Sequence, residues 1–510
     1  MTTRLSRRNF MMTAAAAGAL PFIGAPTARA QATGVLTFGL STYPPSFAAL
    51  QSNGTAAGTI KLLIHRGLLS YDNSGAVRGE LAETWGVDDD GVWTFNLREG
   101  AVWHDGKPVT SADIKWTIES GAAEDSVAAF KSALQTIERV ETPDAKTVKL
   151  YFSEPVATAE TIFGHYNMPM LPEGSAPDGL VGAGPFRIDA RERGVSIDLV
   201  ASDNYYKPGL PKLAGIRAVA YSDENLRVAA LEAGDVDLIE YVPWQSMTSI
   251  EDNSGLALDL VDGPFMYLTF NGNKPPFDNP LVRRAVAHAI KREDIVDAAF
   301  FGRGGALAHL PISNASPFFN PQYENAWAYD PEKSKALLAE AGFPNGFDCT
   351  LLSTAQYGMH TSTAEISQAY LSLVGINAAL DLPDWATRVQ KGNAGEYDLA
   401  VMGTSADSND PDGLTRVINP NLPIAFVRST GLDIPEISTL LAKGRSTFDT
   451  EARKAIYAEL EGVCIETVPM VGLAWRAQGY GMKNNVKGFK NLPGQLTFYS
   501  GVTLETTEIV

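Results

Sequence analysis

The chain has 510 residues and a mass of 54.7 kDa, with 45% apolar side chains, 20% charged side chains and two cysteines. A chain of this length and hydrophobicity can bury a large core in two or three domains, which excludes a disordered protein, a coiled coil and a disulfide-rich miniprotein. The formal charge of −18 predicts an acidic surface that repels phosphate backbones, so we expect no nucleic-acid partner.

The first thirty residues have the features of an export signal. Arginines near the start precede an alanine-rich apolar stretch over 10–23, which is too short to span a bilayer, and Ala28-Arg29-Ala30 has the small-x-small pattern of a cleavage site. The stretch Ser6-Arg7-Arg8-Asn9-Phe10-Met11 resembles the twin-arginine export motif. We expect residues 1–30 to be removed as a signal peptide and the remaining chain to reach the periplasm.

The rest of the chain mixes strand and helix patterns. Alternating apolar and polar residues predict half-buried strands over 93–97, 148–152 and 196–199. Thr110 with Asp113 resembles a capping box before a helix over 112–120. Asn279 before Pro280 predicts a helix over 281–300, and Asp330 before Pro331 predicts one over 332–341. Helices and strands without strict alternation indicate several α/β lobes.

Motifs for local catalytic or metal chemistry are absent from the sequence. The six histidines include no pair at zinc spacing, and the chain has neither a Gly-x-Ser-x-Gly elbow nor a phosphate-binding loop. The acidic run over 407–413 places Pro411 where a calcium loop needs an oxygen ligand. We expect no metal, no cofactor and no catalytic residue, although a sequence alone leaves open a triad assembled in space.

The two cysteines, Cys349 and Cys464, lie far apart in sequence and each lies in an apolar run. In an oxidising compartment they could form a disulfide. Two buried free thiols are the favoured interpretation, because unpaired cysteine behaves as a small buried hydrophobe.

Several blocks together resemble the family 5 extracellular solute-binding proteins, which serve peptide, nickel and opine ABC importers. The resemblance covers nearly all of residues 35–495. The blocks are residues 79–85 and 93–108, ending in His104-Asp105-Gly106-Lys107-Pro108; Val181-Gly182-Ala183-Gly184-Pro185-Phe186; Asn271 with 275–279 and 282–285; 329–333 with 337–342; and Val374-Gly375-Ile376.

Two of these blocks also have a purely structural interpretation. His104 and Asp105 predict a turn at a strand end with internal hydrogen bonds rather than an acid–base pair. Gly182 and Gly184 predict unusual backbone angles beside Pro185.

The resemblance implies an α/β fold of the two-lobed periplasmic-binding-protein type (type II, similar to cluster C), with an extra domain inserted in the first lobe. By matching blocks we expect lobe I at 31–60, 178–262 and 475–510, the inserted domain at 61–177, and lobe II at 263–474. The lobes would be joined by crossings near Asp262-Gly263-Pro264 and near Gly472 to Trp475.

The implied function is the substrate-binding component of an ABC importer. A ligand between the lobes contacts both of them only when they close, so binding shifts the equilibrium toward the closed form that a permease recognises. The expected partners are permease transmembrane subunits and cytoplasmic ATPase subunits, and we expect the chain to act as a monomer.

The ligand implied by the resemblance is a small peptide or a peptide-like amino compound. In peptide-binding members a hydrophobic run leads into Gly-Trp-x-x-Asp, whose Asp receives the α-ammonium group. Here the run leads into Gly403-Thr404-Ser405-Ala406-Asp407, which gives Asp407 that role. Thr404 replaces the family's aromatic residue, and no arginine immediately precedes Gly403, so we expect a smaller or more polar pocket.

Further wall residues are assigned by position in the matched blocks, because aromatic side chains offer large, stiff contact surfaces. They are Thr42, Tyr43, Phe265, Tyr267, Tyr357, His360, Trp385 and Trp475.

Other ligands and one other class of function remain open at this point. The same fold could carry an opine, an oligosaccharide or a nickel ion held by a chelator. An extracytoplasmic hydrolase is the alternative from a different class.

Overall fold

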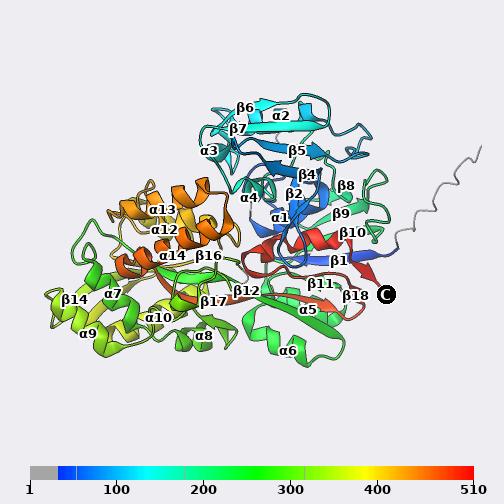
Figure 1. Ribbon diagram of the computed structural model, residues 1–510. Coiled ribbons are helices and arrows are strands. Elements are labelled where there is room, and N and C mark those ends of the chain that lie inside the picture. The colour runs from blue at the N-terminus through cyan, green and yellow to red at the C-terminus, as the bar shows by residue number, and fades with distance from the viewer. Residues whose placement is uncertain (1–32, 53, 177, 315) are drawn as a thin grey trace, which may run out of the picture.

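The computed structural model describes residues 33–52, 54–176, 178–314 and 316–510, so the predicted signal peptide and twin-arginine motif lie outside the described residues. One 11-stranded mixed sheet runs through the main body (Figure 1). In order, its strands are β15 (Ile376–Asp381), β14 (Phe347–Leu352), β16 (Leu399–Thr404), β12 (Leu256–Phe270), β17 (Val471–Lys483), β11 (Leu238–Ile239), β1 (Val35–Leu40), β10 (Gly215–Ala220), β9 (Ser196–Ala201) and β8 (Phe186–Glu192), and β13 (Gly304–Ala306) pairs with β17.

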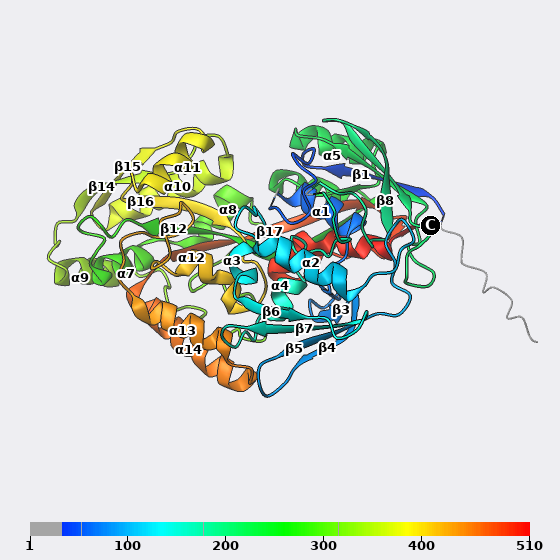
Figure 2. The same ribbon diagram turned by 90° about the horizontal axis from the view of Figure 1, so that it is seen from above.

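The long strands β12 and β17 pair antiparallel and connect two halves of the molecule. We call the half with β1 and β8–β11 lobe I and the half with β13–β16 lobe II. Figure 2 shows β12 and β17 running from one half into the other. The α/β class and the two-lobed architecture predicted from the sequence are therefore confirmed.

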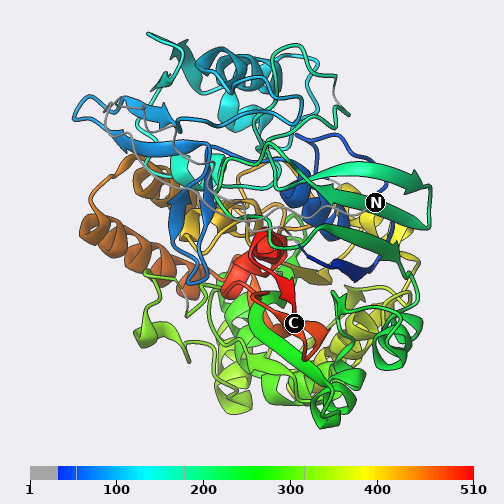
Figure 3. The same cartoon turned by 90° about the vertical axis from the view of Figure 1, so that its right-hand side faces the viewer.

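Lobe I has a core of Phe38, Ile216 and Leu238, against which Ile60 and Leu63 pack. The C-terminal segment, red in Figure 3, lies near the centre of the molecule. The remaining elements of this lobe are α1 (Thr55–Ile64), α5 (Glu224–Ala233), η1 (Trp244–Ser246), α6 (Met247–Asp252), β18 (Val486–Lys487), η4 (Gly494–Glu505) and β19 (Glu508–Ile509).

A smaller four-stranded sheet with a core of its own lies above lobe I in Figure 1. We call this region the small domain; Phe95, Trp103, Leu150 and Phe163 are fully or almost fully buried in it. Its elements are β2 (Leu69–Tyr71), β3 (Val77–Gly79), β4 (Ala82–Val87), β5 (Trp93–Leu97), α2 (Ser111–Ala122), α3 (Lys131–Leu134), β6 (Ile137–Glu141), β7 (Thr147–Phe152) and α4 (Ala159–Phe163).

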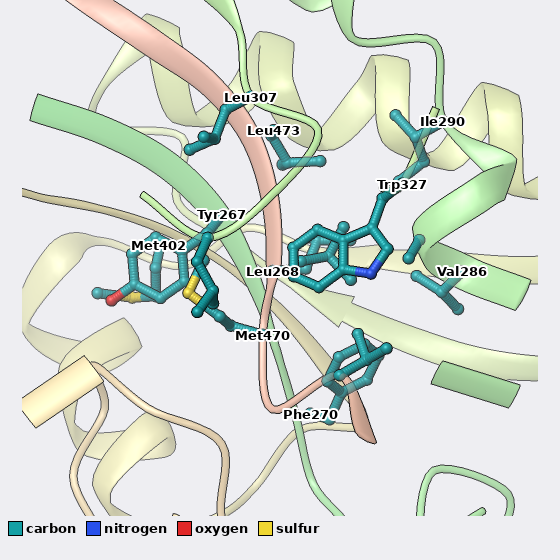
Figure 4. Close-up of a cluster of buried hydrophobic side chains, with 14 of the residues drawn as sticks. Tyr267, Leu268, Phe270, Val286, Ile290, Leu307, Trp327, Met402, Met470 and Leu473 are labelled. Carbon is teal, nitrogen blue, oxygen red and sulfur yellow. The ribbon is translucent and has the colours of Figure 1, made fainter. Parts of the chain in front are cut away.

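Lobe II contains the largest hydrophobic cluster. Figure 4 shows Trp327 beside Val286, Ile290 and Leu268, with Met402 and Met470 further along the cluster. Its helices are α7 (Pro280–Ala289), α8 (Arg292–Phe300), η2 (Pro321–Tyr323), α9 (Pro331–Glu340), α10 (Gly358–Leu373), α11 (Trp385–Ala394), η3 (Pro411–Leu414), α12 (Thr415–Ile418), α13 (Pro435–Ser446) and α14 (Thr450–Thr467).

The expected strands and two of the expected helices are confirmed. Strand β5 covers 93–97, while β7 and β9 contain the two other predicted segments. The capping box at the start of α2 is present: the Thr110 amide donates to Asp113 Oδ2 at 2.8 Å. Asp330 caps α9 by accepting a hydrogen bond from the Lys333 amide at 2.9 Å.

The single helix expected over 281–300 is wrong, because α7 ends at Ala289 and α8 begins at Arg292. The Arg292 side chain is 2% exposed, and it donates hydrogen bonds to backbone carbonyls where the helix is interrupted. Its guanidinium donates to the carbonyls of Ala287 at 3.0 Å and Ile290 at 3.2 Å. A buried arginine thus breaks a helix whose apolar periodicity continues through the break.

His104 forms the expected internal hydrogen bonds: Nε2 lies 3.1 Å from the Gly184 carbonyl, and Nδ1 accepts from the Gly182 amide at 3.3 Å. The glycines are required for a different reason from the one expected. A Cβ on Gly182 would lie 2.1 Å from the Ile64 carbonyl oxygen, and one on Gly184 would lie 2.4 Å from that of Leu63. Close approach to the end of α1, and not an unusual φ, excludes a side chain.

Cys349 and Cys464 are both buried and unpaired, as the favoured interpretation held. Within the described ranges, the helices are too short or too polar to cross a bilayer.

Candidate functional site

The crossing of β12 and β17 is marked by an irregularity in their pairing. Asp262 pairs with Ala477 and Phe265 with Trp475, and the register shifts between these two pairs. Gly263 lies in the shift, where a Cβ would stand 2.0 Å from the Gly494 carbonyl oxygen. The crossing therefore packs directly against the start of the C-terminal segment.

Next to this crossing, two adjoining cavities of about 490 and 390 Å³ separate the small domain from lobe II. Both are lined by Phe130 and His165 from the small domain and by Asp407 and Arg416 from lobe II. The smaller cavity also reaches Gln495, Phe498 and Tyr499 of the C-terminal segment. Side chains from three separate parts of the chain thus converge on one space of a size suited to a small solute.

Asp407 and Arg416 form an ion pair at this space. Arg416 Nε lies 3.3 Å from Asp407 Oδ1, and the same guanidinium donates to Ser405 O at 2.7 Å and to Thr404 Oγ1 at 3.1 Å. The Asp407 side chain is 47% exposed, yet desolvation by the surrounding protein raises its pKa, and Arg416 opposes that rise. A cationic group of a solute would therefore stabilise the Asp407 carboxylate further.

The end of β16 places Gly403, Thr404 and Ser405 beside this pair. Gly403 permits close packing with its neighbours: a Cβ there would lie 2.7 Å from Met266 Sδ and 3.3 Å from His360 Nε2. Of the predicted block, Ser405 and Asp407 line the smaller cavity, and Thr404 accepts a hydrogen bond from Arg416, whereas Gly403 packs behind them.

Tyr357, His360 and Trp385 form an aromatic cluster in lobe II. The Trp385 ring lies 5.5 Å from each of the other two and 6.1 Å from Phe426. Tyr357 is 40% exposed, whereas His360 is buried, and burial lowers the pKa of His360 to about 3. The structure brings these three predicted residues together and keeps the imidazole neutral.

On lobe I, Thr42 and Tyr43 follow β1 and remain exposed or half-buried. Tyr43 packs edge-to-face on Phe47 at 6.2 Å. Both residues belong to the lobe opposite Asp407, and no hydrogen bond or ring contact joins them to the lobe II residues in the part of the chain that the structure describes.

Phe265 and Tyr267 lie in the core and not on a surface that a ligand could reach. Both are 0% exposed, and the Tyr267 hydroxyl donates to the Val427 carbonyl at 2.6 Å. Trp475 packs edge-to-face on Phe265 at 5.9 Å and is only partly buried. This part of β12 lies between β16 and β17 and is buried on both faces, so neither alternate set of its side chains reaches the surface.

Most of the cavity lining was not predicted from the sequence, including Phe130, His165, Arg416 and Tyr499. They come from segments far apart in the chain, apart from Arg416, which stands nine residues after Asp407. The signal for Arg416 was its proximity to the acidic run 407–413. His165 is neutral as well, because burial lowers its pKa to about 3.

Among the described residues, no three His, Cys, Asp or Glu side chains gather in a group that could hold a metal ion. The donors and rings around the cavities are suited to holding an organic solute by hydrogen bonds, ion pairs and stacking.

Comparison with known proteins connects this arrangement with transport. Residues 76–421 match the family model described as bacterial extracellular solute-binding proteins, family 5 middle. The chain is 39% identical to the binding protein AgaA of A. tumefaciens R10, whose structure was solved with agropinic acid; the match covers 94% of this chain and 99% of that one, with a TM-score of 0.82.

Two further relatives span most of the chain. The glutathione-binding protein GsiB of Escherichia coli is 27% identical over 465 residues, covering 87% of this chain and 89% of GsiB. The ABC transporter-associated periplasmic binding protein DppA of Helicobacter pylori, solved with the peptide STSA, shares the fold with a TM-score of 0.78 at 22% identity, over 94% and 98% of the two chains. This chain belongs to family 5 of the bacterial extracellular solute-binding proteins, and it is a binding component of an ABC importer and not an enzyme.

Proposed function

We propose that the protein captures a small amino-acid-derived solute, an opine-like acid or a short peptide, in the space between its lobes. The observation that carries this proposal is the likeness to AgaA over 94% of the chain, at 39% identity with a bound opine. The cavity supports it, since Asp407 and Arg416 offer both signs of charge to a solute bearing an amine and a carboxylate.

The proposed mechanism is closure of lobe I and lobe II about the crossing of β12 and β17. A solute that contacts both lobes binds the closed form more tightly and shifts the equilibrium toward it. The lobe boundaries we propose are those expected from the sequence: 31–60, 178–262 and 475–510 for lobe I, 61–177 for the inserted domain, and 263–474 for lobe II.

The proposed partners are the permease subunits of the importer, driven by cytoplasmic ATPase subunits that dock to the permease. We further propose a periplasmic monomer that is exported by the twin-arginine route. The Arg7-Arg8 pair before Phe10 supports that route.

Within this class of solutes, the likeness to GsiB over 87% of the chain favours glutathione or another short peptide over an opine. A peptide carries an ammonium group that can donate hydrogen bonds to the Asp407 carboxylate. The two candidates therefore differ in what they require of Asp407.

Thermal-shift assays with agropinic acid, glutathione and the dipeptide Met-Leu, run beside product analysis, test the proposal. A bound solute at 100 times its Kd stabilises the folded state by about 2.7 kcal/mol, which is readily measured. Stabilisation without any product supports capture. Absence of stabilisation by every amino-acid-derived solute would reject the ligand class, and mass spectrometry of copurified solute would then identify the true one.

The role of Asp407 has a signed test. Asp407→Asn should weaken an amine-bearing ligand at least tenfold, because the carboxylate that pairs with the amine is lost. The same change should strengthen a ligand that has only acidic groups, because Arg416 loses its internal partner. Asp198→Asn, which breaks a surface pair with Arg217 at 2.9 Å, is the matched control and should leave both affinities unchanged. If Asp407→Asn binds both ligands with the affinity of the wild type, Asp407 does not belong to the site.

A further inference from the structure

Arg476 occupies the crossing strand β17 opposite the register shift of β12. Its side chain lies between the lobes: Nη1 is 3.5 Å from Met359 Sδ at the start of α10 in lobe II. Burial lowers the pKa of Arg476, and the nearby Tyr241 hydroxyl of lobe I opposes that shift. The residue is 9% exposed, so its guanidinium is almost completely removed from water.

Arg476 differs from the other buried arginines in what it contacts. Eight arginines are buried in the described part of the chain, and seven of them donate to at least one carbonyl or carboxylate oxygen. Those seven are Arg66, Arg227, Arg283, Arg292, Arg388, Arg428 and Arg453. Within the described residues, Arg476 reaches no oxygen acceptor, and its Nε has no partner.

The comparison with Arg388 is the most informative one. Within the described ranges Arg388 also has no carboxylate partner, but it donates to the Val401 carbonyl at 2.7 Å, and the rings of Trp385 and Phe426 lie over its guanidinium at 5.6 Å. In the same part of the chain, Arg476 has neither a carbonyl acceptor nor a ring over it. A buried guanidinium without an acceptor costs free energy, which an incoming anion would recover.

A second donor without an acceptor lies at the same crossing. Gln495 is 2% exposed and uses its carbonyl to accept from the Ala406 amide at 2.8 Å, while its Nε2 has no partner among the described residues. Gln495 lines the smaller cavity together with Phe498, whose ring stacks on Tyr241 at 5.9 Å. Tyr241 thus packs on a side chain of the cavity wall and lies close enough to Arg476 to influence its charge.

The backbone of Tyr241 supports a special role for this position. Its φ is 51°, in the left-handed region that a residue with a side chain adopts at an energetic cost. Such strain concentrates at binding sites, where the surrounding structure holds a side chain in one required position.

We propose that Arg476 is the receptor for a carboxylate of the captured solute, with Gln495 as an accessory amide donor. The planar guanidinium matches a carboxylate with two parallel hydrogen bonds, a geometry that lysine does not reproduce. This inference rests on the proposed function, and it specifies that the solute is an acid whose carboxylate lies at the crossing between the lobes.

The first test compares each acid with its neutral derivative on the wild-type protein. Agropinic acid is measured beside its methyl ester, and Met-Leu beside its C-terminal amide, by isothermal titration calorimetry. For whichever of the two acids binds, we expect its neutral derivative to bind at least tenfold more weakly. Binding of agropinic acid would indicate an opine carboxylate, and binding of Met-Leu would indicate a peptide carboxylate. Equal affinity of acid and neutral derivative overturns the inference without any variant.

The second test uses Arg476→Gln and Arg476→Lys. We expect Arg476→Gln to lose at least tenfold in affinity for the acid and little for the neutral derivative, and Arg476→Lys to recover only part of the loss. Without ligand, Arg476→Gln should melt at the same temperature as the wild type or higher, because it removes an uncompensated charge. Arg292→Gln should melt lower, since Arg292 donates to carbonyls of Ala287, Leu307 and Trp327.

The outcomes separate this inference from the proposed function. Tight binding of the acid by both the wild type and Arg476→Gln overturns the role of Arg476 and leaves the proposed function standing. Failure of the wild type to bind any of the acids overturns both. A lower melting temperature of unliganded Arg476→Gln together with unchanged discrimination between acid and neutral derivative would mean a purely structural arginine.

Discussion

Two regions of the molecule bury charges in opposite ways. At the boundary of the small domain and lobe I, Arg66 pairs with Glu80 at 2.7 Å and with Glu505 at 2.9 Å, and Lys207 bridges the same two carboxylates at 2.6 and 2.9 Å. At the crossing of the lobes, Arg476 has no carboxylate partner in the described part of the chain. The first region satisfies its charges within the chain and joins three distant segments. The second leaves a charge to be satisfied by a molecule from outside.

The largest effect is expected in the paired region. Glu505→Ala leaves Arg66 and Lys207 without one of their two shared carboxylates, so we expect a loss of about 3–5 kcal/mol in the free energy of unfolding. Urea denaturation of the two proteins measures this loss. The control is Glu508→Ala, which removes a half-exposed pair with Lys212 at 2.8 Å and should change stability by at most about 1 kcal/mol. Similar losses in both variants would contradict the distinction drawn between buried and exposed pairs.

The Glu505 carboxylate also determines how the stability of the protein responds to acid. The positive charges of Arg66, Lys207 and Arg78 hold the pKa of Glu505 well below its usual value against the opposing effect of burial. A depressed folded-state pKa gives stability that is present above the ordinary carboxyl pKa of about 4.3 and is lost as the pH falls toward the folded value. The stability difference between wild type and Glu505→Ala should therefore shrink below about pH 4. A difference that stays constant down to pH 3 would contradict it.

A smaller effect of opposite sign is expected for Glu461 on α14. This side chain is 1% exposed, its Oε2 has no hydrogen-bond partner in the described chain, and burial raises its pKa to about 8. A raised carboxyl pKa means that wild-type stability falls as the pH rises from about 4.5 to about 8. Glu461→Gln should remove this contribution to the slope, so its stability relative to the wild type should increase as the pH rises through this range. Glu459→Gln, on the exposed side of the same helix, is the control and should show the wild-type slope.

The smallest effect provides a baseline outside both charged regions. Thr110→Ala removes the side-chain part of the capping box at the start of α2 and should cost about 1 kcal/mol, while Thr110→Ser should retain most of the stability. A thermal melt of the three proteins at neutral pH measures the difference. A loss as large as that of Glu505→Ala would contradict the expected ranking, because a helix cap usually contributes far less than a buried ion-pair network.

The elements that the sequence predicted are those set by local chemistry. Strand β5 and the caps of α2 and α9 follow from residues within a few positions of each other. The break between α7 and α8 escaped prediction because Arg292 bonds to carbonyls as distant as Gly472. Long-range contacts of this kind leave no periodic signal in the chain.

The site was predictable to a similar extent. Asp407 lies in a block whose local pattern survives in the sequence, and the structure places it at the cavity. Phe265 and Tyr267 occupy the crossing as expected, but β12 is buried on both faces there, which places them in the core of lobe II. Arg476 carries no local signal at all, since what distinguishes it is that it finds no oxygen acceptor among the described residues of the folded chain.

The two buried thiols offer a practical consequence. Burial raises the pKa of Cys349 to about 12 and also raises that of Cys464, so neither forms the thiolate that reacts with maleimides at neutral pH. A cysteine introduced at an exposed position of lobe II, such as Tyr357, can therefore be labelled selectively with a fluorophore. The emission of the dye would then report closure of lobe I and lobe II. The labelled protein would become a reagentless fluorescent sensor for the solute that it binds.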